Sequence, residues 1–148
     1  MKTYSALGLA LFFVASLFTL AAGQNESIVG RWKTIDDETG RAKSIVSIYE
    51  QDGMFFGKID TLFREEGEDP DPLCDKCPQN DPRYNQRVKG MVILENLKKK
   101  GKEWKDGKIL DPGKGKIYDC KMWIEDGNLK VRGYLLFLYR TQTWYRVD

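Results

Sequence analysis

Histidine is absent from this chain of 148 residues. Histidine is the commonest general base in enzymes, the commonest metal ligand and the usual switch near neutral pH. Its absence excludes a Ser-His-Asp or Cys-His catalytic arrangement within the chain. We therefore assign no catalytic residue, predict no metal site and no cofactor, and favour a non-enzymatic function over an enzymatic one.

Long apolar runs are also absent, except at the N-terminus. Residues 6–22 form an apolar block after the basic Lys2, and Gly23 supplies a small residue at its end. A basic start, an apolar centre and a small-residue exit are typical of an export signal, and the block is near the lower length limit for a membrane span. We predict that 1–23 is a cleaved signal peptide. The mature chain, 24–148, is then one soluble domain in the periplasm or the extracellular medium.

Net charge of one sign is lacking as well. Once Lys2 is set aside with the signal, 23 basic residues face 22 acidic ones. A nearly neutral domain lacks the excess positive charge that binds nucleic acid or an anionic membrane. The basic cluster at 98–102 is flanked by Glu95 and Glu103 and is interpreted as a solvated loop. We predict no nucleic-acid partner and no stable membrane insertion after signal cleavage.

Proline is scarce outside one segment. Four of the five prolines fall in residues 64–89, which contain almost no apolar residues. Proline cannot donate to a sheet ladder, so this segment cannot be a central strand. We predict a long loop, and loops of this length are usually functional, tethered or disordered.

Cysteine is rare, and its count of three is odd. Cys74 and Cys77 form a C-x-x-C pair in the long loop, whereas Cys120 lies in a strand-like segment, 116–124. Period-two alternation places Cys120 in an apolar row of that segment, where a thiol behaves as a small hydrophobe. We predict a Cys74–Cys77 disulfide and a buried, free Cys120. A bridge from Cys120 to the loop would leave one loop thiol free, which is unfavourable outside the cell.

The C-x-x-C pair has two other interpretations. A redox pair needs a helix after it to lower a thiol pKa, but Pro78 follows here and Asp75 lies inside the motif. Zinc would need two more ligands, and only Cys120 and carboxylates are available. A structural staple of the loop is preferred, with a redox pair second and a metal site third.

The remaining sequence is a succession of short strand-like segments and tight turns. Asp-Gly pairs at 52–53, 106–107 and 126–127 predict turns. Residues 95–103 are interpreted as a polar connection with room for a helical turn. Strands at this spacing indicate an all-β fold, a single antiparallel up-and-down β-barrel of about eight strands. The predicted strands are 30–34, 43–50, 54–63, 90–94, 108–110, 116–124, 129–138 and 141–147.

The last strand carries a concentrated polar and aromatic face. Alternation places Arg140, Gln142, Trp144 and Arg146 on one side of it. Arginine planes stack on tryptophan and hold carboxylates in bidentate fashion. The face either forms a mouth that grips an anionic or aromatic ligand, or closes one end of the barrel with an Arg–Trp stack; the second interpretation is preferred. The candidate ligand-binding residues are Arg132, Tyr134, Arg140, Gln142, Trp144, Tyr118 and Asp111.

Carboxylates offer the main route to an enzymatic interpretation. Asp111, Asp119 and Glu125 are candidates for paired carboxylates in hydrolysis. Asp111 precedes a proline at a turn, where its side chain can bond to the backbone. The turn role explains Asp111 without catalysis, so the enzyme stays an alternative.

The first and last strands together resemble a known structural signature. Gly30-x-Trp32 near the start, with an arginine near the end, is similar to the signature of lipocalin-like (calycin) barrels. In those barrels the arginine packs across the tryptophan and plugs the base. The resemblance implies this plugging role for Trp32 with Arg146, or else with Arg140.

A longer set of motifs runs through most of the mature chain. The motifs are Gly30-x-Trp32, Gly90-Met91-x-Ile93-Leu94, Trp104-x-x-Gly107-Lys108-Ile109-x-Asp111-Pro112-x-x-Gly115-Lys116-x-Tyr118, Leu129-Lys130-Val131-Arg132-Gly133-Tyr134 and Arg140-Thr141-Gln142-Thr143-Trp144-x-Arg146. Together they resemble the DUF2147 family of small exported bacterial proteins, whose function is unassigned. The C-x-x-C before the middle strand is similar to a subgroup of that family. Members often have a glycine-containing segment where this chain has the apolar run 135–139, and no catalytic residue is transferred by the resemblance.

These observations predict an exported, lipocalin-like barrel that is a monomer or a weak dimer. We expect it to bind a small apolar or amphipathic ligand, with aromatics of 54–63 and 118–123 lining the lumen, or to serve as a cell-envelope accessory protein. One alternative is an enzyme that acts through carboxylates, tyrosine and arginine on a lipid or glycan. Another is a protein–protein module whose loop 64–89 meets an envelope partner.

Overall fold

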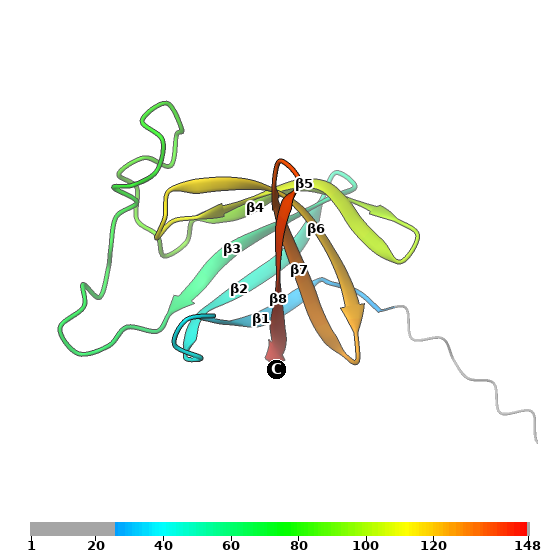
Figure 1. The fold of residues 1–148 in the computed structure, drawn as a ribbon, viewed down its shortest axis with the longest axis horizontal. Helices are drawn as coiled ribbons and strands as arrows, with labels where there is room; N and C mark the ends of the chain where they lie inside the picture. The colour runs from blue at the N-terminus through cyan, green and yellow to red at the C-terminus, as the bar shows by residue number, and fades with distance from the viewer. Residues whose placement is uncertain (1–25, 148) are drawn as a thin grey trace, which may run out of the picture.

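The computed structural model describes residues 26–147, and the predicted signal peptide at 1–23 lies outside the described residues. Eight antiparallel strands follow one another around a closed barrel, and the last pairs with the first (Figure 1). The prediction of a single all-β, up-and-down barrel is confirmed. The strands are β1 (Gly30–Ile35), β2 (Ala42–Gln51), β3 (Met54–Leu62), β4 (Val92–Lys100), β5 (Glu103–Asp111), β6 (Lys116–Glu125), β7 (Asn128–Leu135) and β8 (Leu138–Val147).

No helix in residues 26–147 has both the length and the apolar character needed to cross a membrane.

The up-and-down order puts alternate connections at opposite ends of the barrel. One end, called the mouth below, carries the loop at 36–41, the long loop at 63–91 and the turns at 112–115 and 136–137. The other end, called the closed end, carries the remaining three turns together with the start of β1 and the end of β8. Any site at the mouth is therefore assembled from four separate connections.

Strand β2 shows why these segments fold as strands. Ser44, Val46 and Ile48 are buried, and the residues between them are more exposed. Successive side chains of a strand point to opposite faces, so this period of two puts one row into the barrel and the other into solvent. The same alternation places Cys120 and Met122 of β6 in the interior, as the sequence predicts.

Two of the three Asp-Gly pairs form hairpin turns of two residues. Asp52 and Gly53 have φ of 52° and 75°, and Asp126 and Gly127 have the same values. Positive φ at both central residues is the type I′ pattern, whose twist matches that of the flanking strands. These turns set the registers of β2–β3 and β6–β7 at the closed end.

The third pair, Asp106-Gly107, is not a turn, so that prediction is wrong. Asp106 has φ of 61° and lies inside β5, at a bulge where the register with β6 shifts. Leu97 supplies the reason, because its side chain is fully buried and would touch any Cβ added to Gly107. Glycine lets the backbone close over Leu97, which an Asp-Gly rule based on local sequence does not consider.

The polar segment 95–103 is likewise not a loose connection. β4 runs on to Lys100, and Gly101, with φ of 64°, begins a tight turn into β5. Lys98 and Lys100 are exposed and pair with β5 partners, so the lysines coat the outer face of a hairpin. Exposed lysine is compatible with a strand whose inner row is apolar, and the prediction of a helical turn is corrected.

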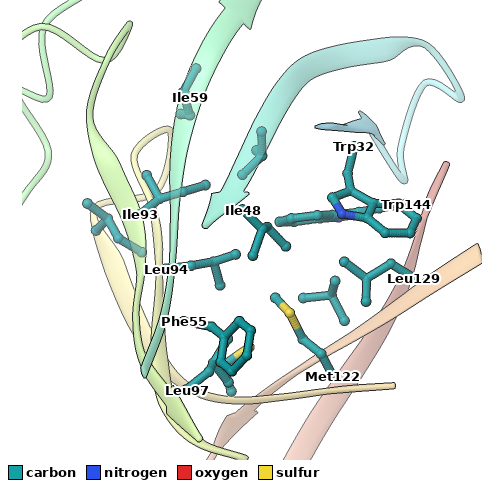
Figure 2. Close-up of a cluster of buried hydrophobic side chains, with 14 of the residues drawn as sticks. Trp32, Ile48, Phe55, Ile59, Ile93, Leu94, Leu97, Met122, Leu129 and Trp144 are labelled. Carbon is teal, nitrogen blue, oxygen red and sulfur yellow. The ribbon is translucent and has the colours of Figure 1, made fainter. Parts of the chain in front are cut away.

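The closed half of the barrel is filled by large side chains. Trp32, Trp144, Leu129 and Met122 point inward from four neighbouring strands, and Phe55 and Leu97 fill the opposite side (Figure 2). Full burial of an aliphatic side chain is worth roughly 1.5–3 kcal/mol, so this cluster is the main source of stability. The largest side chains with almost no exposure are Trp32, Trp144, Ile28, Leu94, Leu97, Leu110, Met122, Leu129 and Val46.

The long loop at 63–91 is folded against itself. The backbone N–H of Cys74 donates to the carbonyl of Gln86 at 2.8 Å, and that of Val88 donates to Pro72 at 2.9 Å. These bonds pair the two arms of the loop in a short antiparallel ladder. The loop therefore lies at one side of the mouth and is held in shape by its own backbone hydrogen bonds (Figure 1).

Candidate functional site

The half of the barrel nearest the mouth contains a chamber of about 680 Å³. Small-molecule sites usually occupy ~300–1,000 Å³, so the chamber has room for one small ligand. Its walls come from three of the mouth connections, at 36–41, 63–91 and 112–115, and from the parts of the eight strands nearest the mouth. The lumen is thus packed in the half nearest the closed end and hollow in the half nearest the mouth.

The inner wall of the chamber is apolar. Trp144, which is 2% exposed, lies at the boundary between the chamber and the packed half. Gly133 lines the chamber without a side chain, and a Cβ there would be in ordinary van der Waals contact with Tyr118 at 3.4 Å and Ile109 at 3.9 Å. The apolar lining includes Ile59, Leu62, Ile93, Ile109, Leu110, Val131, Leu135, Leu138 and Trp144.

A polar network connects this wall to the rim. Trp144 Nε1 donates to Gln142 Oε1 at 3.2 Å, and Gln142 Nε2 donates to Asp37 Oδ2 at 2.6 Å. Arg140 Nη2 lies 3.1 Å from the same carboxylate oxygen. The network satisfies the buried indole N–H and balances the Arg140 charge, so the rim presents a neutral polar edge.

The rim loop that carries Asp37 is held by its neighbour Asp36. The Asp36 carboxylate accepts hydrogen bonds from the backbone N–H groups of Thr39 at 2.8 Å and Glu38 at 3.0 Å. These bonds, led by the one from the Thr39 backbone, hold the pKa of Asp36 below its usual value. The loop is therefore fixed where Asp37 meets β8.

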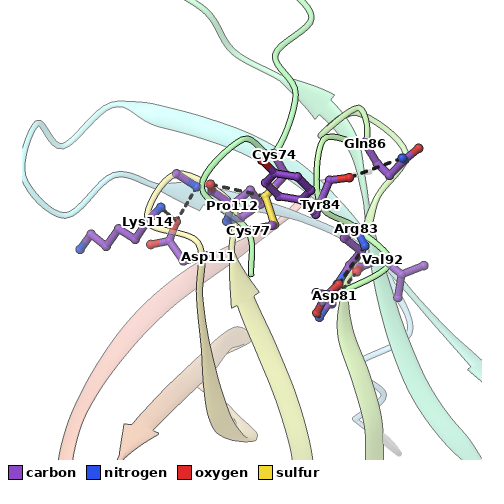
Figure 3. Close-up of a disulfide and its surroundings, with 11 residues drawn as sticks. Cys74, Cys77, Asp81, Arg83, Tyr84, Gln86, Val92, Asp111, Pro112 and Lys114 are labelled. Carbon is purple, nitrogen blue, oxygen red and sulfur yellow. Dashed lines mark hydrogen bonds and ion pairs between the residues drawn. A yellow bond between two sulfur atoms is a disulfide. The ribbon is translucent and has the colours of Figure 1, made fainter. Parts of the chain in front are cut away.

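Asp111 lies at the rim opposite this network. Its carboxylate accepts hydrogen bonds from the backbone N–H of Gly113 at 3.0 Å and of Lys114 at 3.3 Å (Figure 3). Lys43 Nζ is 3.9 Å from Asp111. Asp111 thus shapes the β5–β6 turn and pairs with a lysine while also lining the chamber.

The other two candidate carboxylates lie elsewhere. Asp119 is on the outer face with Lys108, and Glu125 lies 3.6 Å from Lys130 near the closed end. The structure does not bring either of them to Asp111, so the chamber has no carboxylate pair formed by these three residues.

The seven candidate ligand-binding residues separate into two groups. Arg140, Gln142, Trp144, Tyr118 and Asp111 line the chamber. The remaining two, Arg132 and Tyr134, are absent from that lining because Val131 and Gly133 occupy the inward positions of β7.

Arg132 forms its own cluster on the outside of the barrel. Its guanidinium lies 4.9 Å from the Trp123 ring centre and 4.4 Å from that of Tyr139, and its Nε donates to Thr141 Oγ1 at 2.7 Å. The same alternation sends Trp123 outward, so the aromatics of 118–123 do not all line the lumen as expected. Applying the period of two to β7 would have placed Arg132 outside.

Several chamber residues lie outside the candidates chosen from the sequence. Asp37 completes the polar network from a loop distant in sequence, and Gly133 creates space by lacking a side chain. Ile59, Ile93 and Val131 give the wall its apolar character. Inward alternation could have found the aliphatic residues, whereas nothing local marks Asp37.

Comparison with protein families now identifies the barrel. A family described as "Uncharacterized protein conserved in bacteria (DUF2147)" matches residues 30–146. The chain belongs to the DUF2147 family. No curated protein matches it.

A solved structure shares the DUF2147 barrel seen here. It is described as protein HP1028 from the human pathogen Helicobacter pylori, belonging to the lipocalin family. The TM-score is 0.70 at 22% sequence identity, with 82% of this chain and 84% of that chain covered. The likeness shows that the fold of this DUF2147 protein is lipocalin-like.

The closed end of the DUF2147 barrel is sealed by an Arg–Trp stack. The Arg146 guanidinium lies 4.2 Å from the Trp32 ring centre, and its Nη2 donates to the Ser27 carbonyl at 2.8 Å. Gly30 has φ of 137°, and a Cβ there would lie 2.8 Å from Arg146 Nη1. Glycine is therefore needed both for its backbone conformation and for the close approach of the arginine.

The DUF2147 loop carries the predicted disulfide, which is confirmed between Cys74 and Cys77. Cys74 Sγ lies 3.7 Å from the Pro112 carbonyl, and a Cβ on Gly115 would collide with the Lys76 carbonyl (Figure 3). The stapled segment therefore packs directly on the β5–β6 turn at the mouth. The disulfide fixes part of the chamber rim.

Arg83 anchors the other arm of the loop. It donates to Asp81 through Nε at 2.8 Å and Nη2 at 2.7 Å, and to the Val92 carbonyl through Nη1 at 3.2 Å. The hydrogen bond from Arg83 holds the pKa of Asp81 below its usual value. Beside this anchor lies an open hollow of about 730 Å³ outside the barrel, against β4.

Proposed function

We propose that this protein is exported and binds a small apolar or amphipathic molecule in the chamber, without transforming it. The observation that carries the proposal is the 680 Å³ hollow, walled by aliphatic side chains and bounded below by Trp144. An apolar ligand gains free energy there because it leaves water and contacts buried aliphatic groups.

The distribution of polarity supports an amphipathic ligand. The inner wall is apolar, whereas the rim holds the Asp37–Arg140 and Lys43–Asp111 pairs. A molecule with an apolar tail and a polar end can place the tail against Trp144 and leave the polar end at the rim. The two ion pairs offer the ligand both donors and acceptors.

Export is supported by the disulfide. Disulfides persist in oxidising compartments and are rare in the bacterial cytoplasm. The Cys74–Cys77 bridge lies in a loop beside the mouth, where it limits the motion of the rim. Together with the predicted signal at 1–23, it supports a location outside the cytoplasm for the proposed binding activity.

A cavity-filling substitution tests the proposal. cis-Parinaric acid, a fluorescent fatty acid, would be titrated into the wild-type protein and into Gly133→Phe. Because Gly133 faces the chamber and has ordinary backbone geometry, the phenyl ring can enter the hollow. We expect saturable binding by the wild type and a Kd weakened by about tenfold or more in Gly133→Phe, a loss of about 1.4 kcal/mol or more.

Gly133→Ala is the matched control. Its methyl group meets Tyr118 and Ile109 at van der Waals distances, so we expect the affinity to stay near that of the wild type. Urea unfolding would show that both variants remain folded. Equal affinity of the wild type and folded Gly133→Phe, or no saturable binding by the wild type, would overturn the proposal.

A further inference from the structure

The β7–β8 turn presents an unusual apolar tip. This tip, residues 135–139, has the sequence Leu-Leu-Phe-Leu-Tyr and stands at the mouth. Leu136 is 86% exposed and Phe137 is 87% exposed. The two flanking leucines and Tyr139 are also largely exposed, so five consecutive large apolar residues face solvent. Contiguous exposed apolar surface of this kind marks an interaction site.

Turn geometry does not account for these residues. The tip turns in two residues, and Leu136 has φ of 58°. Of the three other turns of this length, two use Asp-Gly, and the β4–β5 turn has Gly101 at its first central position. Glycine is the usual residue where the first central position alone has positive φ. Leucine is unfavourable in this backbone conformation and also unfavourable in water. A favourable contact of the Leu136 side chain with a partner outside this chain would offset both costs.

Exposed apolar residues are concentrated at the mouth. Val29 and Tyr145 are the two such residues near the closed end within the described chain. The other seven belong to the tip or to the long loop at 63–91, which lies at the same end of the barrel. They are Phe63, Leu73, Leu135, Leu136, Phe137, Leu138 and Tyr139.

A collar formed by Arg132, Tyr134 and Tyr139, the last residue of the tip, lies at the base of the tip. Tyr134 and Tyr139 pair with ring centres 5.9 Å apart, and the Arg132 guanidinium covers Tyr139 at 4.4 Å. Tyrosine and arginine have an apolar body and a polar end, and both favour the boundary between lipid and water. The order along the hairpin is thus apolar tip, amphipathic collar and polar barrel.

We propose that this tip inserts into the surface of a lipid bilayer, so that the chamber mouth opens onto the membrane. Leu135 and Leu138 belong both to the tip and to the chamber lining. They form a continuous apolar path from the bilayer to the chamber. The ligand then passes between membrane and chamber without crossing water, and this part of the inference rests on the proposed ligand-binding function.

The tip fits a lipid surface better than a protein surface. A standard protein interface uses about 20–30 residues on each side, whereas the tip has five in one narrow hairpin. The polar rim carries both signs of charge, as the Asp37–Arg140 and Lys43–Asp111 pairs show. Burial of apolar side chains therefore supplies the binding energy, and a neutral bilayer is a sufficient partner. The contact is peripheral and involves no membrane-spanning segment.

The test separates membrane binding from ligand binding. Flotation with phosphatidylcholine vesicles would compare the wild type with Leu136→Asn/Phe137→Gly, which installs a favourable hairpin turn and so keeps the fold. We expect the double variant to lose about tenfold or more in vesicle partitioning, a change of about 1.4 kcal/mol or more. Tyr145→Ser removes an exposed aromatic from the closed-end part of the same strand, and it should float like the wild type.

A transfer assay completes the test. cis-Parinaric acid would be supplied either free in buffer or loaded into vesicles. We expect the double variant to bind free acid like the wild type but to extract it from vesicles about tenfold more slowly or worse. Gly133→Phe should float normally and take up neither form.

Each contrary result has a distinct meaning. Flotation of the double variant at the wild-type level would overturn the membrane proposal while leaving the chamber proposal intact. Self-association of the wild type without flotation, abolished by the double substitution, would also overturn it and assign the tip to a second copy. Flotation without any uptake of free acid would instead overturn the chamber function and keep the tip as a membrane contact.

Discussion

The closed end of the barrel is sealed by two side chains, Trp32 and Arg146. The pair of Gly30 and Trp32 is visible in the sequence, and so is an arginine near the C-terminus. Which arginine stacks on the tryptophan depends on strand register. In the β1–β8 ladder Trp32 is opposite Arg146, and Arg140 lies six residues away at the mouth. Sequence alone could not choose between them, because register is set by the closure of the whole barrel.

Removing the stacked arginine should destabilise the barrel. We expect Arg146→Ala to lower the free energy of unfolding by about 1–2 kcal/mol, because it removes a cation–π contact and hydrogen bonds to the Ser27 and Val29 carbonyls. Urea unfolding followed by tryptophan fluorescence measures the change. Arg140→Ala is the control, and its exposed ion pair is worth at most about 1 kcal/mol. An equal effect of the two substitutions would show that the stack contributes little.

Cys120 should be chemically silent in the folded protein. Burial raises the pKa of its thiol to about 12, because the thiolate would lose its hydration. Below that pH the native thiol stays protonated and unreactive. Ellman's reagent should therefore detect no thiol in the native protein, one after unfolding and three after unfolding with reduction. Two or three thiols without reduction would refute the Cys74–Cys77 bridge.

At the scale of elements, the strands were more predictable than the connections. Alternation in β6 and β8 assigns each inward row correctly, because a half-buried strand must repeat every two residues. The bulge at Asp106 was not predictable, since it depends on Leu97 from a neighbouring strand. The fold of the loop at 63–91 was also hidden, because its hydrogen bonds join residues that have no periodic pattern.

Arg83 should control the order of the long loop. We expect Arg83→Ala to increase amide hydrogen exchange across 78–91 while the barrel strands stay protected, because the anchor to Asp81 and Val92 is lost. Hydrogen exchange read by mass spectrometry measures this directly. Arg87→Ala, which removes an exposed ion pair with Asp71, is the control in the same loop. Unchanged exchange in Arg83→Ala would contradict the assigned anchor.

The Arg83–Asp81 pair also makes the stability of the loop depend on pH. Because Arg83 lowers the pKa of Asp81, the folded loop favours the ionised carboxylate. Its contribution to stability is present above the ordinary aspartate pKa and is lost as pH falls through the lowered value. Loop exchange should therefore rise at strongly acidic pH in the wild type and depend less on pH in Arg83→Ala.

At the scale of the whole molecule, the barrel is half filled. Large tryptophan, leucine and methionine side chains pack the closed half, whereas the mouth half has Gly133 and the small buried pair Thr34 and Ser44. The barrel itself could be predicted, because eight regularly spaced strands close in few ways. The chamber could not, because its existence depends on which inward side chains fall short of filling the lumen.

Methyl NMR would show directly whether a ligand occupies the chamber. Laurate would be titrated into protein with labelled isoleucine, leucine, valine and methionine methyl groups. We expect saturable shifts for the chamber residues Ile59 and Val131, with Leu97 and Met122 of the packed half little changed. Shifts confined to the tip at 135–139, or no saturable shift at all, would contradict ligand binding in the chamber.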